Sequence, residues 1–133
     1  MYNLIIIDDE YEIRVGLANY YPWDRIGFQV VEIFDSPVSA IDFIKTNGVD
    51  VILSDIKMPG MSGLDFARHI HETSPTIRIV FISGYKSFDY LKEAIEYKVF
   101  NYLLKPVTHE DINKTFSALK SELDAEITAS LES

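Results

Sequence analysis

Residues 4–10 read Leu-Ile-Ile-Ile-Asp-Asp-Glu, four consecutive apolar residues followed at once by three acids. A run of this length suits a strand, and a strand that is apolar on both faces must be covered on both sides, as in a central parallel sheet. Runs rich in Val and Ile recur at 29–34, 49–53 and 77–82, with a weaker one at 101–104. Together these runs predict five strands.

The segments between the runs have helical spacing and clear end signals. In the second, Ser36 caps the helix, Pro37 occupies its first position and Asn47-Gly48 ends it. Each predicted helix has apolar residues on one face: Ile13, Leu17 and Tyr20; Ala40, Ile41 and Ile44; Leu64, Ala67 and Ile70; Leu91, Ala94 and Ile95; Ile112, Phe116, Leu119 and Leu123. Strand and helix alternate five times, which predicts an α/β fold: a doubly wound (βα)5 five-stranded parallel sheet with helices on both faces.

The composition narrows the class of protein. The chain has 133 residues, with 12 Lys and Arg against 21 Asp and Glu, so its net charge is −9. This length suits one domain, and the lack of cysteine excludes a disulfide scaffold, a zinc–thiolate site and a thiol nucleophile. The apolar runs are far shorter than the roughly 18 residues of a membrane span, and Met1-Tyr2-Asn3 lacks the basic flank expected of a signal peptide. We therefore expect a cytoplasmic protein that contacts no membrane and does not itself grip nucleic acid.

Polar residues follow the predicted strands. They are Asp8, Asp9 and Glu10; Ser54 and Asp55; Ser83 and Gly84; and Lys105 and Pro106. Because ligands of doubly wound sheets bind outside the carboxyl ends of the strands, we expect these groups at one edge. Each has an ordinary explanation by itself, as a helix cap, a turn residue or a solvated charge. Their coincidence at one edge favours a functional site.

The chemistry of such an edge points to a divalent cation. Neighbouring carboxylates repel one another unless a cation or a lysine neutralises them. Mg²⁺ is the natural ion, because it prefers oxygen ligands and is held by one or two carboxylates together with phosphate oxygens. One carboxylate can then attack phosphorus to form an aspartyl phosphate. Lys105 and the Ser83 hydroxyl would contact the phosphoryl oxygens.

The sequence resembles the receiver domains of bacterial two-component response regulators, which have the flavodoxin-like CheY fold. Four motifs carry the resemblance: Ile5-Ile6-Ile7-Asp8-Asp9-Glu10; Asp55-Ile56-Lys57-Met58-Pro59-Gly60 with Gly63; Ile82-Ser83-Gly84; and Tyr102-Leu103-Leu104-Lys105-Pro106. The resemblance implies a receiver domain at 1–122. Residues 123–133 would be the C-terminal end of the fifth helix or a linker toward an output domain.

The resemblance also implies roles at the metal and the phosphoacceptor. It makes Asp55 the phosphoacceptor and Asp9 a direct ligand of Mg²⁺. Asp8 would act as a ligand through water, and the backbone carbonyl of Lys57 would complete the protein's share of the metal ligands. Lys105 would pair with the phosphoryl oxygens, and the Lys105–Pro106 bond would be cis.

Further residues are expected to change conformation on phosphorylation or to set how long the phosphoryl group persists. The resemblance makes Ser83 and Tyr102 the switch residues that respond to phosphorylation. Lys57 and Tyr85 come just after the phosphoacceptor and the switch hydroxyl, where side chains flank the path of an attacking water. We expect these two to tune the lifetime of the phosphoryl group, with the bulky Tyr85 shielding it.

The expected partners follow from the same resemblance. They are a sensor histidine kinase and a second copy. The two copies would dimerise through the face formed by the predicted fourth helix at 87–97, the fifth strand at 101–104 and the fifth helix, which starts at Thr108. The stretch Ser83-Gly84-Tyr85-Lys86-Ser87-Phe88-Asp89-Tyr90 is similar to receivers that are joined to AraC-type DNA-binding regions. DNA would then be bound only through such a fused domain. The domain would not be an enzyme, but would take a phosphoryl group onto itself and lose it by autodephosphorylation.

Three alternatives belong to other classes. A magnesium-dependent phosphatase of the haloacid dehalogenase type also forms an aspartyl phosphate, but its first strand ends in Asp-x-Asp, unlike Asp8-Asp9-Glu10. A flavodoxin-type binding module needs a phosphate loop where this chain has three acids. A pseudo-receiver would act by interaction alone, which the full set of acids, hydroxyl and lysine disfavours.

Overall fold

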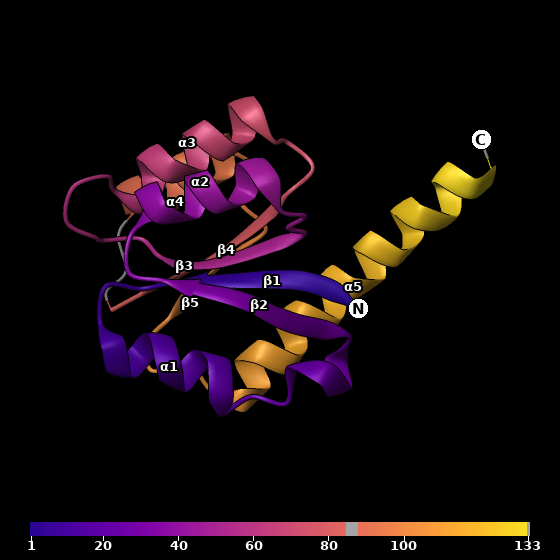
Figure 1. The fold of residues 1–133 in the computed structure, drawn as a ribbon, viewed down its shortest axis with the longest axis horizontal. Helices are drawn as coiled ribbons and strands as arrows, with labels where there is room; N and C mark the ends of the chain where they lie inside the picture. Colours follow the sequence, from indigo (N-terminus) through magenta and orange to yellow (C-terminus); the bar gives the residue numbers. More distant parts are fainter. Residues whose placement is uncertain (85–87, 133) are drawn as a thin grey trace.

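Five parallel strands form the centre of the protein in its computed structural model, which describes residues 1–84 and 88–132. The strands are β1 (Tyr2–Ile7), β2 (Phe28–Phe34), β3 (Val51–Asp55), β4 (Arg78–Ser83) and β5 (Asn101–Leu104). They lie in the order β2-β1-β3-β4-β5, and every neighbouring pair is parallel. The predicted doubly wound sheet is therefore confirmed (Figure 1).

Helices cover both faces of the sheet. They are α1 (Tyr11–Asn19), α2 (Pro37–Thr46), α3 (Gly63–Thr73), α4 (Phe88–Glu96) and α5 (His109–Glu132), with a short 3-10 helix η1 (Trp23–Ile26). In Figure 1, α1 and α5 lie on one face, and α2, α3 and α4 lie on the other. Because all strands are parallel, their carboxyl ends share one edge, and the residues that follow them meet there.

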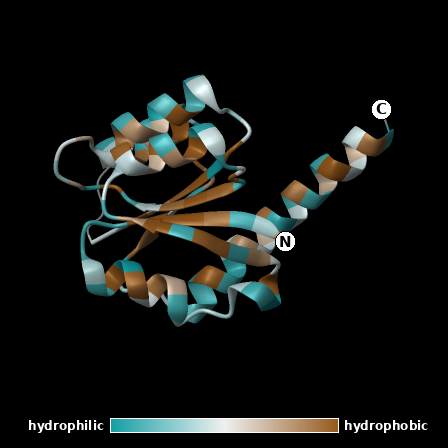
Figure 2. Cartoon of the chain, in the orientation of Figure 1, coloured by the Kyte–Doolittle hydropathy of each residue, from teal (hydrophilic) through white to brown (hydrophobic). Residues whose placement is uncertain are grey.

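The alternation of side chains along β1 explains why its apolar run is unbroken. Leu4 and Ile6 belong to the core between the sheet and the layer of α1 and α5. Ile5 and Ile7 belong to the core on the other face, with residues of α2, α3 and α4. All four side chains are fully buried. A strand with helices on both faces therefore has no polar side over its buried part, and the central strands are mostly brown, the hydrophobic colour, in Figure 2.

The outer strands are less buried than the prediction of a fully covered sheet implied. Val31 in β2 is 37% exposed, and Leu104 in β5 is 45% exposed. β2 and β5 are the two edges of the sheet, so each has a neighbouring strand on one side only. Their burial patterns mix exposed and buried positions, whereas β3 is buried at every position.

The predicted start of α2 is confirmed, and α3 has a cap of the same kind. The Ser36 hydroxyl accepts a hydrogen bond from the amide of Ser39 at 3.5 Å, and Pro37 begins α2. The Ser62 hydroxyl accepts one from the amide of Asp65 at 3.1 Å. Side-chain oxygens at this position satisfy amides of the first turn that have no partner within the helix.

Two residues assigned to inward helix faces are in fact exposed. Tyr20 is 77% exposed, because α1 ends at Asn19 and no longer directs the side chain toward the sheet. Ile95 is 69% exposed, because α4 packs against the core through Ala94 and the next residue points about 100° away around the helix.

Helix α5 extends past the sheet. Its 24 residues span about 36 Å, and its C-terminal part projects from the body in Figures 1 and 2. Residues 123–132 therefore continue the helix rather than forming an irregular linker. Among the described residues, no helix combines the length and the apolar composition needed to cross a membrane.

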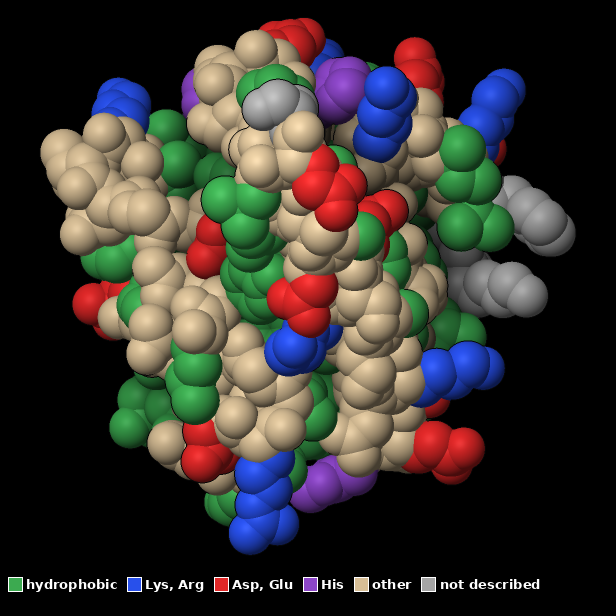
Figure 3. Space-filling model, turned by 90° about the vertical axis from the view of Figure 1, so that its right-hand side faces the viewer, with side chains coloured by type: hydrophobic (Ala, Val, Ile, Leu, Met, Phe, Trp, Pro, Cys, Tyr) green, Lys and Arg blue, Asp and Glu red, His purple; other side chains and the backbone are tan. Residues whose placement is uncertain are grey.

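Polar contacts hold α5 to the strand starts where it leaves the sheet. The Tyr2 hydroxyl of β1 donates to Asp124 at 2.5 Å, and partial burial together with this bond raises the pKa of Tyr2 to about 12. Arg78 at the start of β4 pairs with Glu122 at 3.1 Å and also with Glu126. Figure 3 shows the face from which α5 projects, where Lys and Arg lie beside Asp and Glu.

Candidate functional site

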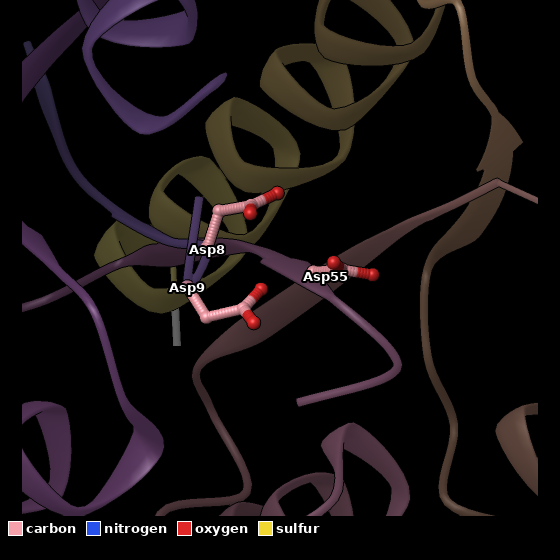
Figure 4. Close-up of side chains that lie close together, drawn as sticks. All are labelled: Asp8, Asp9 and Asp55. Carbon is pink, nitrogen blue, oxygen red and sulfur yellow. The ribbon is translucent and has the colours of Figure 1, made fainter. Parts of the chain in front are cut away.

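Three carboxylates meet at the carboxyl edge of the sheet. Asp8 and Asp9 follow β1, and Asp55 ends the neighbouring strand β3. One oxygen atom from each lies within 4.8 Å of the other two. Figure 4 shows the three carboxylates together at this edge. Asp8 and Asp55 are buried and Asp9 is exposed, so the cluster has one side open to solvent.

Lys105 joins the cluster from the end of β5. Its Nζ lies 3.2 Å from a carboxylate oxygen of Asp8 and 3.3 Å from one of Asp55. Burial alone would lower the pKa of Lys105, but the two carboxylates outweigh this effect and raise its pKa. The lysine therefore stays protonated and partly neutralises the cluster. The Lys105–Pro106 peptide bond is cis, as predicted.

Asp8 is fixed on all sides. Its amide donates to the carbonyl of Phe34 at 3.1 Å, and its carboxylate accepts from the amide of Glu10 at 2.9 Å as well as from Lys105. Burial raises the pKa of Asp8, although the Glu10 amide and Lys105 act in the opposite direction. Ionised Asp8 is therefore destabilised by its burial. A second cation near its carboxylate would stabilise the ionised form.

The connection after Asp55 is shaped by a close backbone approach. The amide of Lys57 donates to the Asp55 carboxylate at 3.3 Å, and the Lys57 side chain is exposed. The amide of Gly63 donates to the carbonyl of Ile56 at 2.8 Å. A Cβ at position 63 would lie only 2.6 Å from the Ile56 Cα, so only glycine allows this approach. The loop after Asp55 thereby brings the start of α3 directly against Ile56, and Asp55 lies at the carboxyl edge of the sheet.

The two switch candidates lie on neighbouring strands. Ser83 ends β4 and is buried, and Tyr102 in β5 is partly buried. Ser83 pairs with Leu104 in the sheet, and its carbonyl accepts a hydrogen bond from the amide of Lys105 at 2.8 Å. The hydroxyl-bearing residue and the lysine thus belong to one edge. The lifetime candidate Tyr85 lies outside the described residues.

A groove opens beside the cluster. It has a volume of about 750 Å³ and lies between α1 and the connection from β5 to α5. Its lining includes Ile13 and Tyr20 of α1, together with Gly84, Lys105 and Pro106. The groove therefore offers an accessible surface directly next to Lys105.

The donor set fits Mg²⁺. Three carboxylates supply hard oxygen atoms close enough to share one ion, and the open side at Asp9 leaves room for water and phosphate oxygens. The absence of cysteine and the oxygen-only cluster disfavour a soft metal.

One contact to the cluster was not predicted from the sequence. The Nη1 of Arg14 donates to the backbone carbonyl of Asp8 at 2.9 Å. The signal that could have found it is position: Arg14 lies one helical turn after Glu10, at the start of the helix that follows the acids.

The family profile described as the response regulator receiver domain matches residues 4–117 of this sequence. The chain belongs to this family. The receiver domain is 32% identical over 123 residues to the uncharacterized transcriptional regulatory protein YesN of Bacillus subtilis, a match that covers 92% of this chain and 33% of YesN. It is 32% identical over 112 residues to the transcriptional regulatory protein HptR of Staphylococcus aureus, covering 84% of this chain and 44% of HptR.

Solved structures agree with this assignment. The receiver domain of AraT, a response regulator from Geobacillus stearothermophilus, is 31% identical, with a TM-score of 0.86 over 94% of this chain and 97% of that one. A DNA-binding response regulator of the LuxR family from Staphylococcus aureus is 25% identical, with a TM-score of 0.79 over 89% of this chain and 98% of that one. The receiver domain spans a third to a half of the length of the curated relatives described above.

Proposed function

We propose that this receiver domain is a phosphoacceptor switch in which Asp55 receives a phosphoryl group from a sensor histidine kinase or a small phosphodonor. The observation that carries the proposal is the convergence of Asp8, Asp9, Asp55 and Lys105 at one edge of the sheet. Three carboxylates around one lysine keep an excess of negative charge at this edge. A phosphoryl acceptor that must bind a cation needs this arrangement.

The chemistry assigns a task to each group. An oxygen of the Asp55 carboxylate attacks phosphorus, the new P–O bond forms, and the bond from phosphorus to the donor's leaving atom breaks. Asp8, Asp9, Asp55 and the carbonyl of Lys57 would hold Mg²⁺, which when bound offsets the negative charge of the phosphoryl oxygens. Lys105, now paired with the carboxylates, turns one of its donors to a phosphoryl oxygen.

The switch follows from the new acceptor oxygens. The Ser83 hydroxyl moves toward the phosphoryl group, and Tyr102 moves into the space that this opens. Phosphorylation shifts the equilibrium between the two states only by the difference in these contacts. Lys57, exposed beside Asp55, borders the path of a hydrolytic water and sets part of the lifetime.

The face formed by α4, β5 and α5 is the proposed output surface. Ile95 of α4 and Leu104 of β5 are exposed apolar residues on these elements. A second copy that covers them would remove apolar area from water, so we propose that phosphorylation promotes dimerisation there. Size-exclusion chromatography of the phosphorylated domain tests this, and a phosphorylated species that remains monomeric would exclude it.

The output of the whole protein is proposed from the relatives. YesN and HptR are described as transcriptional regulatory proteins, and both are longer than this chain. We propose a cytoplasmic regulator in which this domain controls an attached DNA-binding region of the AraC type. The receiver itself, with a net charge of −9, would not contact DNA.

The deciding experiment is intact-mass spectrometry after incubation with acetyl phosphate. Wild type with Mg²⁺ should gain one phosphoryl group, and wild type with EDTA should not. Asp55→Asn should gain none, whereas Asp42→Asn, an equal change at an exposed carboxylate of α2, should behave as wild type. A folded wild type that is not labelled would identify a pseudo-receiver, and turnover of small phosphate esters without a labelled protein would point to a phosphatase.

A further inference from the structure

The two acids after β1 are joined by a single peptide group. That group contains the carbonyl of Asp8 and the amide of Asp9 in one rigid plane. The orientation of the Asp8 carbonyl therefore determines the direction in which the chain continues to Asp9, whose carboxylate is exposed at the open side of the cluster.

Arg14 holds this carbonyl. Its Nη1 donates to the Asp8 carbonyl oxygen at 2.9 Å, a hydrogen bond with a charged donor. The arginine is itself fixed at the first turn of α1, since its amide donates to the carbonyl of Glu10 at 3.0 Å. Its guanidinium lies over the ring of Tyr11, with Cζ 5.4 Å from the ring centre, within the range of a cation–π interaction.

The contacts of Asp8 divide into two kinds. Lys105 and the Glu10 amide donate to its carboxylate. A ligand that binds the carboxylate therefore has to share its oxygen atoms with these donors or displace them. Arg14 donates to the backbone carbonyl rather than to the carboxylate, so its contact does not compete with a ligand of the carboxylate. It is thus suited to hold the loop in one geometry in every state of the site.

We propose that Arg14 is a positioning residue, which fixes the Asp8–Asp9 peptide so that the Asp9 carboxylate stays in place for Mg²⁺. This inference rests on the proposed function and extends it to a residue that contacts neither the metal nor the phosphoryl group. Groups that orient metal ligands often change metal affinity by about 10-fold or more when they are removed. The positive charge of Arg14 acts in the opposite direction, because it repels a cation at the cluster.

The two effects predict opposite results, which makes the proposal testable. Isothermal titration of MgCl2 into metal-free protein should give a dissociation constant about 10-fold higher for Arg14→Ala than for wild type. Arg14→Lys, which keeps a donor of similar length, should recover most of the affinity. Arg25→Ala removes the same charge from an exposed position in η1 and should match wild type. Unchanged or tighter binding by Arg14→Ala would overturn the proposal.

Phosphorylation kinetics provide a second readout. With acetyl phosphate in excess, Arg14→Ala should need more Mg²⁺ for half-maximal rate but should reach nearly the wild-type rate at saturating Mg²⁺, because Asp55 and Lys105 are intact. A rate that stays low at every Mg²⁺ concentration would indicate general damage to the fold and count against positioning.

The failure of this inference can be told from the failure of the proposed function. If wild type binds Mg²⁺ and is labelled while Arg14→Ala matches it, only the role of Arg14 is wrong. If wild type itself neither binds Mg²⁺ nor is labelled, the phosphoacceptor function is wrong. Should Arg14→Ala not fold, Arg14→Met, which keeps much of the side chain's length but has no donor, gives the same comparison.

Discussion

At the scale of single residues, Asp8 shows the conflict between stability and function. It is fully buried, and burial raises its pKa even though Lys105 lies 3.2 Å away. A carboxylate in this setting is retained at a cost to the folded state. Such costs are typical of functional sites, where stability and activity oppose each other.

The pKa of Asp8 predicts how a neutral substitution changes stability. Because the pKa of Asp8 in the folded state lies above its ordinary value of 3.8, the folded protein binds more protons than the unfolded one between these two values. Stability from this group therefore falls as pH rises through that range. Asp8→Asn, which cannot ionise, should be more stable than wild type by about 0.5–2 kcal/mol at pH 7, with a smaller gain near pH 4.

Urea unfolding at the two pH values, with EDTA present, measures this difference. Asp42→Asn changes an exposed carboxylate of α2 and serves as the control. If Asp8→Asn is less stable than wild type at pH 7, burial is not the dominant effect on Asp8.

Gly63 gives a prediction about backbone packing. The Cβ of Gly63→Ala would lie 2.6 Å from the Ile56 Cα, so the loop after Asp55 or the start of α3 must shift. We expect a loss of about 1–3 kcal/mol in the free energy of unfolding. Gly48→Ala is the matched control, because its nearest neighbour is a side-chain atom of Asn3 at 3.9 Å, and it should change stability by less than about 1 kcal/mol. Chemical denaturation of the two variants compares them directly, and equal stabilities would contradict the close approach.

The sequence predicted the positions of those site residues that directly follow or end a strand. Asp8, Asp55 and Lys105 meet as predicted, because parallel strands bring their carboxyl ends to one edge regardless of side-chain detail. The contact of Arg14 with the Asp8 carbonyl could not be derived, since it depends on the direction of a long side chain. The roles of these residues in phosphoryl transfer stay predictions until labelling is measured.

At the scale of elements, the attachment of α5 to the sheet is the feature with the clearest energetic consequence. Arg78 has a side chain only 15% exposed and pairs with two carboxylates of α5, and it also donates to the carbonyl of Thr76. These contacts link the start of β4 to the last turns of the helix. Leu123 is the last residue of α5 that packs in the core, so polar contacts hold the helix at and just beyond this point.

Removal of Arg78 should therefore loosen the end of α5. Arg78→Met keeps much of the side chain's volume and should lose roughly 1–2 kcal/mol of stability. Amide hydrogen exchange should become faster in 124–132 than elsewhere in the molecule. Arg68→Met breaks an exposed pair within α3 and should cost no more than about 0.5 kcal/mol. Unaltered exchange in 124–132 would show that the helix end does not depend on Arg78.

Element types were predictable, and their ends less so. Apolar runs and caps located every strand and α-helix among the described residues, but not the short 3-10 helix η1, because burial and capping leave local signals only in the longer elements. The prediction began β3 at Val49, but the strand begins at Val51, since pairing with β1 starts there. The exposure of Ile95 depends on which face of α4 meets the sheet, which spacing alone left ambiguous.

At the scale of the whole molecule, metal binding is coupled to folding. The carboxylates of the cluster come from residues 47 positions apart in sequence, Asp8 and Asp55, so the site exists only when β1 and β3 are paired. A ligand that binds only the folded state stabilises it by an amount set by its concentration and its dissociation constant.

Mg²⁺ should accordingly raise the melting temperature of wild type. At a concentration about 100 times the dissociation constant the gain is about 2.7 kcal/mol, which corresponds to several degrees for a domain of this size. Asp9→Asn should lose most of this shift, and Asp42→Asn should keep it. Differential scanning fluorimetry with MgCl2, and with KCl at matched ionic strength, measures the effect. A shift that is equal in all three proteins would place the bound cation elsewhere.

The order of the strands has a mechanical consequence. β1 begins at Tyr2 and leads into Asp8, and β4 begins at Arg78 and ends at Ser83. Two of the strands that lead to the carboxyl edge of the sheet thus also contact α5 at their opposite ends, through Tyr2 with Asp124 and Arg78 with Glu122. Beyond these contacts, which reach Glu126, the end of α5 at 127–132 is about 9 Å long. A tilt of the helix by about 10° where these contacts hold it would move Glu132 by roughly 1.6 Å.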